Sequence, residues 1–470
     1  MGKKLFLVIY FAFFLIFFIA FEVPILTELS FILNFISLTF FMIYNIQYEK
    51  EFSPFLSVFI VFQILFFIVA PVVQIDFIVS KGFDGSGSFI QNFPFTEEMC
   101  IRANAYIFLF NIVFFMTYLY FKRKIRTSKD ISYNYPQIPL YLLALAFFSI
   151  LLILFNFKSI LFQYQNEFYK EAEQTSVSNY LIVQKFLYFI PFSAVILAQY
   201  YLKSKKKLTV NFYVVVILLF FFIAVILFLK NPLTEKRNAL GPLYITLLFL
   251  FFRKILNTNY KVTSFMFFSM VLIFPVLTII THSRYTLSQM IAKPILISKN
   301  IEYLSVNDAF NSLHYDAYPN FLATIDFYDK KPVVYGEQLS CSLFFFVPRS
   351  VWKDKPETTG FKIGNYLIDK YKFNFNNLSN PYISEAYINF GIIGIILFAT
   401  ALSYFFMIMI KWIQSQDYLK VVFAFYFSIY LMYFLRGDLT NGFAFIVAFW
   451  MAVIVVPKYI FALIMYYVRK

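Results

Sequence analysis

The chain has 470 residues, of which 61% are hydrophobic and only 14% are charged, and its formal net charge is +15. Soluble domains carry about 25% charged residues, so this chain could not cover its own surface in water. The composition excludes a soluble enzyme, a nucleic-acid-binding protein and a disordered protein, and it indicates an all-α polytopic membrane protein.

Twelve apolar runs predict transmembrane helices. A helix needs roughly 20 apolar residues to cross about 30 Å of hydrocarbon. No small-residue cleavage site follows the first run, so we expect an uncleaved span and not a signal peptide. The eighth run is short, and its boundaries are the least well defined. In chain order the runs are 5–21, 25–44, 55–75, 103–121, 138–157, 180–202, 212–229, 239–252, 262–281, 382–410, 421–435 and 443–463.

The distribution of charge predicts the orientation of these spans. With the N-terminus in the cytoplasm, the inner loops and tails hold 20 of the 40 basic residues but only four of the 25 acidic residues. Lys and Arg mark the cytoplasmic side of membrane proteins. We therefore expect a multi-pass protein with both termini cytoplasmic.

One long segment, 282–381, contains no apolar run and falls outside in this topology. Loops of this length are either functional or disordered, and the apolar cluster at 343–347 favours a folded structure. The sequence thus predicts three parts: transmembrane helices 1–9 in 1–281, an extracytoplasmic (periplasmic) cap in 282–381, and transmembrane helices 10–12 in 382–470. Eleven of the 12 glycines lie outside or in the outer half of a span, which predicts irregular backbone there.

Arginines on the outer side are candidate ligand contacts. Arg102, Arg237, Arg284 and Arg436 lie at outer ends of spans, and Arg349 lies in the cap segment. Guanidinium groups hold phosphate in a bidentate manner. Their alternative role is to extend toward lipid headgroups.

The candidate general bases are also outside. His282 and His314 are the two histidines of the chain, and a positioned base contributes about 10²–10⁴ in rate. A structural role for either histidine is the alternative, and Asp316 or Asp326 could serve as the base instead.

Other site types have little support in the sequence. The close acidic pairs outside are Glu97–Glu98 and Asp326–Asp329, which lack accompanying zinc ligands, and a magnesium site from scattered carboxylates is left open. There is no phosphate-binding loop, dinucleotide fingerprint or zinc-protease motif. Cys100 and Cys341 both lie outside, where a disulfide is chemically permitted, and their pairing is left open.

Four segments carry a resemblance to a known family. They are Asn-Pro-Leu-Thr-Glu-Lys-Arg-Asn at 231–238, Val-Pro-Arg-Ser-Val-Trp-Lys-Asp-Lys-Pro at 347–356, Glu-Ala-Tyr-Ile-Asn-Phe-Gly-Ile-Ile-Gly at 385–394, and Leu-Arg-Gly-Asp at 435–438. Together they resemble the bacterial O-antigen polymerases of the Wzy type, the oligosaccharide repeat unit polymerases.

The resemblance implies a GT-C-like membrane fold and an inverting, metal-independent and cofactor-free glycosyl transfer at the outer face of the bacterial inner membrane. The donor would be a glycan on undecaprenyl pyrophosphate, and the product an O-antigen or capsular-type polysaccharide. In this interpretation pyrophosphate or sugar is contacted by Arg237, Arg284, Arg349 and Arg436. The base is His314 or Glu385.

Alternatives remain open at this point. An O-antigen ligase or a lipid-linked oligosaccharide flippase would share the general plan, and a chain-length regulator and a flippase of the same pathway are the expected partners besides lipids. No nucleic-acid partner is expected. Glu385 could simply favour a helix N-terminus, and Gly391 and Gly394 could simply permit close helix packing.

Overall fold

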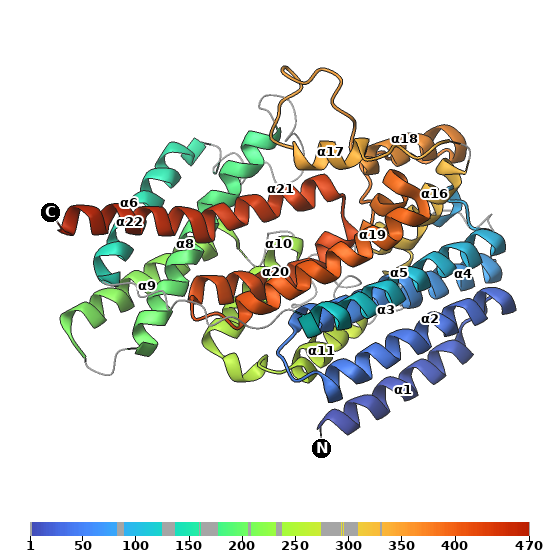
Figure 1. The fold of residues 1–470 in the computed structure, drawn as a ribbon, viewed down its shortest axis with the longest axis horizontal. Coiled ribbons are helices and arrows are strands. Elements are labelled where there is room, and N and C mark those ends of the chain that lie inside the picture. The colour runs from blue at the N-terminus through green and yellow to red at the C-terminus, as the bar shows by residue number, and fades with distance from the viewer. Residues whose placement is uncertain are drawn as a thin grey trace.

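The computed structural model describes residues 2–81, 89–124, 137–158, 160, 177–204, 208–231, 237–273, 293, 295, 309–329 and 331–469. Every regular element in these ranges is helical (Figure 1). Ten of the helical stretches are long and apolar enough to cross a membrane. The expectation of a polytopic all-α membrane protein is therefore confirmed.

The helices follow one another with short connections. The helices of the first half are α1 (Gly2–Ala20), α2 (Ile25–Ile43), α3 (Pro54–Ile64), α4 (Ala70–Lys81), α5 (Glu97–Lys124), α6 (Ile138–Phe155), α8 (Val177–Ser204), α9 (Val210–Leu229), α10 (Arg237–Phe251) and α11 (Asn259–Phe267). Those of the second half are α16 (Ala317–Tyr328), α17 (Glu337–Leu343), α18 (Thr359–Tyr371), α19 (Tyr382–Ile413), α20 (Tyr418–Arg436), α21 (Leu439–Trp450) and α22 (Val456–Arg469).

Short π-helical and 3₁₀ segments complete the fold. The π-helical segments η1 (Tyr44–Tyr48), η2 (Leu65–Val69), η5 (Phe268–Ile273) and η7 (Met451–Val455) extend or join the long helices. The segment η2 thereby makes α3 and α4 one span, and η7 does the same for α21 and α22. The 3₁₀ turns are η3 (Phe89–Asn92), η4 (Arg253–Ile255) and η6 (Leu313–Tyr315).

Ten of the twelve expected runs coincide with these spans. The 239–252 run forms a shorter apolar helix, Leu240–Phe251, and the 262–281 run lies within the described residues only as far as Ile273. The total of twelve spans and the boundaries of the three predicted parts stay predictions.

Helix α3 lies at the centre of the bundle. All of its residues are buried, and it packs against α2, α11, α19 and α20. Its sequence is apolar on every face, as expected for a helix surrounded by other helices. The helices at the periphery, such as α1 and α9, instead expose large apolar side chains, which suits contact with lipid.

Helices α16, α17 and α18, called the cap below, lie together at one end of the bundle, and neither terminus lies at that end (Figure 1). The cap packs on α5, α19 and α21. Polar side chains join helices at the opposite end, where Glu49 pairs with Lys122 and Asp417 pairs with Lys458.

Helix α19 breaks where it passes the cap. Gly391 adopts φ +60° and ψ −140°, a conformation that a residue with a Cβ rarely adopts. The break frees the carbonyl of Ile388, which accepts a hydrogen bond of 3.1 Å from the backbone N–H of Val334. The Gly391–Gly394 motif therefore shapes α19 itself and ties its first turns to the cap segment.

Candidate functional site

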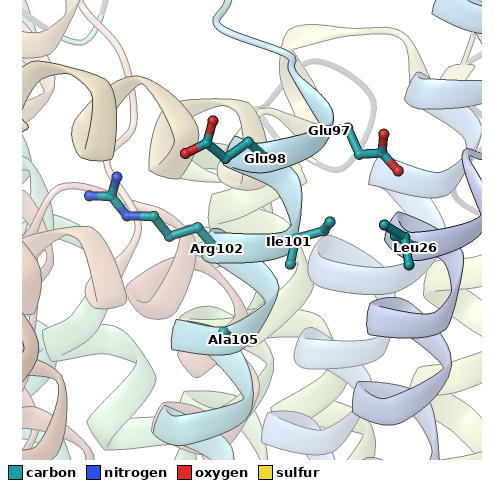
Figure 2. Close-up of a pocket in the computed structure, with 6 residues that line it drawn as sticks. All are labelled: Leu26, Glu97, Glu98, Ile101, Arg102 and Ala105. Atoms are coloured by element: carbon teal, nitrogen blue, oxygen red, sulfur yellow. The ribbon is translucent and has the colours of Figure 1, made fainter.

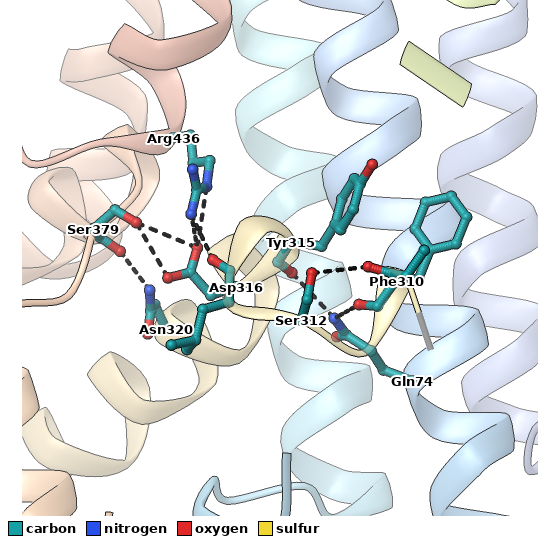
Figure 3. Close-up of polar contacts among 10 residues, drawn as sticks. Gln74, Phe310, Ser312, Tyr315, Asp316, Asn320, Ser379 and Arg436 are labelled. Carbon is teal, nitrogen blue, oxygen red and sulfur yellow. Dashed lines mark hydrogen bonds and ion pairs between the residues drawn. The ribbon is translucent and has the colours of Figure 1, made fainter. Parts of the chain in front are cut away.

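Arg436, the last residue of α20, joins a turn that lies 120 residues earlier in the chain (Figure 3). Its Nε and Nη2 donate to Oδ1 of Asp316 at 3.1 and 2.9 Å. Nη2 also donates to the carbonyl of Leu313 at 2.6 Å. The Asp316 side chain is 3% exposed and that of Arg436 is 21% exposed, so the pair lies at the edge of the protein interior.

The 309–316 turn is held from several sides. Nε2 of Gln74, in α4, donates to the carbonyls of Phe310 and Tyr315, both at 3.1 Å. Ser379 donates its hydroxyl to Oδ2 of Asp316 at 3.1 Å (Figure 3). Both oxygens of Asp316 are thus used, and Arg436 is fixed by a carboxylate that is itself fixed.

His314 lies in this same turn. It occupies η6 between Leu313, whose carbonyl binds Arg436, and Tyr315, and its side chain is exposed. The structure therefore brings two of the candidates selected from sequence, His314 and Arg436, to the same place at the cap end of the bundle. No local sequence pattern connects them.

Glu385 is placed differently. It is only 1% exposed, in the first turn of α19. Its Oε1 accepts a short hydrogen bond from the hydroxyl of Thr359 and one of 3.2 Å from the backbone N–H of Leu439. Glu385 thus contacts the turn that follows Arg436 and has no exposed surface toward a substrate.

Asp438 completes this buried cluster. Its Oδ1 caps α21 by accepting from the N–H groups of Thr440 and Asn441 at 2.9 and 3.3 Å. Its Oδ2 accepts from the hydroxyl of Thr359 at 3.2 Å. Because Glu385 and Asp438 both bind Thr359, the start of α18 and the α20–α21 turn are held together directly beside Arg436.

The other arginines proposed from sequence do not join this arrangement in the described part of the chain. Arg349 donates from Nη1 to the carbonyl of Lys355 at 2.6 Å and from Nη2 to that of Pro356 at 3.3 Å, so it ties its own loop together. Arg284 and His282 lie outside the described residues, and so does the side chain of Arg237. Convergence of the four arginines is therefore not tested.

Asp326 is a less suitable base than the sequence suggested. Its Oδ2 accepts from Tyr366, Lys370 and Tyr371 at 2.6, 2.7 and 2.8 Å. Burial acts to raise the pKa of Asp326, but these hydrogen bonds outweigh it and leave the pKa below its usual value. A lowered pKa weakens a general base, so this cluster serves to hold α16 against α18.

A second feature of the cap end was missed as a site by the sequence reasoning. Arg102 forms a bidentate pair with Asp329 and donates to Tyr106 and Tyr387 at 3.3 Å. It borders an open pocket between α2 and α5, whose rim is charged and whose floor is apolar (Figure 2). The lining residues are Leu26, Glu97, Glu98, Ile101, Arg102 and Ala105. The signal in the sequence was the acidic pair followed by an arginine at the start of a span.

Two remaining candidates concern metals and thiols. Among the described residues, no three His, Cys, Asp or Glu side chains are grouped so as to hold a metal ion. Cys100 and Cys341 are both buried and free, so the disulfide that the sequence left open is not formed.

Comparison with known proteins adds one family. Residues 364–469 match the family model described as O-antigen polysaccharide polymerase Wzy. This range contains two of the four segments that carried the resemblance, 385–394 and 435–438, and the resemblance is thereby confirmed. The match supports O-antigen polymerisation by a membrane glycosyltransferase acting on a lipid-linked oligosaccharide. None of the curated proteins and none of the solved structures matches the chain significantly.

Proposed function

We propose that the chain polymerises undecaprenyl pyrophosphate-linked oligosaccharide repeat units by metal-independent, inverting glycosyl transfer at the outer face of the inner membrane. Besides the family match, the observation that carries this proposal is the position of Arg436 beside the exposed His314 at the cap end of the bundle. A cation and a candidate base are the two groups that this transfer needs.

Arg436 is the proposed contact for the leaving diphosphate. Its bonds to Asp316 and Leu313 use Nε and Nη2. Within the described residues this leaves the N–H groups of Nη1 for a ligand, and Asp316 orients them. Charge develops on the diphosphate as the glycosidic bond breaks, and a preorganised guanidinium stabilises it without reorganisation.

His314 is the proposed general base. In an inverting displacement the acceptor hydroxyl oxygen attacks the anomeric carbon, and the bond from that carbon to the diphosphate oxygen breaks with its electron pair. The hydroxyl proton passes to the imidazole of His314. Glu385, the alternative base, is buried, so we assign it the role of positioning the α20–α21 turn together with Asp438.

Arg237, Arg284 and Arg349 remain proposed contacts for pyrophosphate or sugar. Arg349 is exposed and bound to carbonyl groups of its own loop, so a glycan is the ligand within its reach that we favour.

Removal of the gene from its host tests the reaction class. Loss of a polymerase leaves a single repeat unit on lipid A core, loss of a ligase leaves none, and re-expression restores the ladder of chain lengths. If the deletion strain kept a full ladder, or lost all O-antigen, the proposal would be wrong. A purified preparation in liposomes that moves lipid-linked units across the bilayer without lengthening glycans would indicate a flippase instead.

A further inference from the structure

The loop between α17 and α18 has its charged side chains turned inward. Nζ of Lys355 donates to the carbonyls of Phe344, Phe345 and Val347 at 3.2, 2.9 and 2.9 Å. The guanidinium of Arg349 donates to the carbonyls of Lys355 and Pro356. The two cations thus satisfy backbone oxygens of the loop, which is a compact and internally bonded structure.

The apolar side chains of the same loop point outward. Phe346 is 60% exposed and Val351 is 76% exposed, and Leu343 and Phe344 are exposed as well. A loop surrounded by water would bury these groups and expose its cations, because exposed apolar surface is unfavourable in water. Contiguous exposed apolar patches mark interaction sites. The arrangement indicates a surrounding medium that is partly apolar.

The loop also lies at the level where a helix enters the bilayer. Ser342 and Thr440 share a hydrogen bond of 2.9 Å, and the ring of Phe345 lies 6.3 Å from that of Phe443. Thr440 and Phe443 belong to the first turns of the membrane span Leu439–Tyr467. In Figure 1 the loop projects across the axis of α21 and does not extend along it.

We propose that this loop is an interfacial membrane anchor. Leu343, Phe344, Phe346 and Val351 insert into the phospholipid leaflet that surrounds the cap end of α21. Aromatic side chains favour this interface, and the apolar face of an interfacial segment lies about 5–10 Å into the headgroup and acyl boundary. The exposed Lys353 then faces lipid phosphate groups. The anchor continues the lipid-facing surface of α21 and does not depend on the proposed reaction.

A fluorescent reporter tests this. The native tryptophans are replaced in the W352F/W412F/W450F background, and a single tryptophan is introduced as F346W. The matched control is D369W in the same background, because Asp369 is exposed on α18 in the cap. In phospholipid nanodiscs, we expect lipids with a nitroxide near the top of the acyl chain to remove most of the F346W emission. The D369W emission should be lost to aqueous iodide instead.

V351W serves as a second reporter if F346W does not fold. Equal iodide quenching of the loop and control reporters, without quenching by the labelled lipid, would overturn the proposal. So would protection that appears only when a soluble glycan is added, which would make the loop a sugar-stacking surface. Protection that depends on protein concentration would indicate a second copy of the chain and would overturn it as well.

Discussion

The pair formed by Arg436 and Asp316 allows structural and catalytic roles to be separated. The R436M variant leaves a carboxylate that is 3% exposed without its cation. Breaking a buried pair costs about 3–5 kcal/mol. Because Arg436 is itself partly exposed, we expect R436M to lose about 2–3 kcal/mol of stability.

The double variant R436M/D316N removes both charges together. Replacing both members of a pair is far less costly than removing one, and the amide oxygen that D316N introduces can still accept from Ser379. We therefore expect the thermal unfolding midpoint of R436M/D316N to lie close to that of the wild type. Activity should behave differently, because removal of one preorganised donor costs about 10²–10³ in rate.

The assay measures both properties on the same preparation. Chain extension is followed with a lipid-linked repeat unit in nanodiscs, and unfolding is followed by the loss of monodisperse protein on heating. D316N alone is the matched control, since it keeps the guanidinium. If R436M/D316N unfolded like the wild type and also extended chains at a rate within about twofold, Arg436 would be a structural residue and the assignment to diphosphate would fail.

Three further predictions follow from the described contacts. H314Q should lower turnover by about 10²–10⁴ with little change in unfolding temperature, because the side chain is exposed; unchanged turnover would transfer the base role elsewhere. Asp326 has a lowered pKa in the folded protein, so its stabilising contribution is complete above the unfolded value of about 3.9 and is lost as the pH falls from there toward the folded pKa; hydrogen exchange in α16 and α18 should rise over that range in the wild type, whereas D326N should be less stable at pH 7 and change less on acidification. G391A should cost about 1–3 kcal/mol because of the positive φ of Gly391, and an unfolding midpoint equal to that of the wild type would show that α19 can straighten.

Much of the architecture was open to prediction from the sequence, because membrane insertion is decided locally. A run of about 20 apolar residues is sufficient to form a span, and ten of the twelve expected runs are spans in the structure. The break in α19 was visible only in part. The glycines at 391 and 394 were noted for packing, while the φ of +60° depends on how the cap segment meets the carbonyl of Ile388.

The candidate site shows the opposite dependence. His314 and Arg436 could each be selected as an outer polar residue, but their contact joins positions 120 apart and requires α4, η6 and α20 to be packed together. Glu385 had the correct residue type for a base, yet tertiary packing buried it against Thr359 and Leu439.

The amino-acid sequence by itself determined that this chain forms membrane-spanning helices and which residue types lie at their ends, because hydrophobic length and charge act through nearest neighbours and the bilayer. Only the tertiary structure decided which of those ends meet. A hydrogen bond such as that between Arg436 and Asp316 depends on the relative positions of distant segments, which no local pattern encodes.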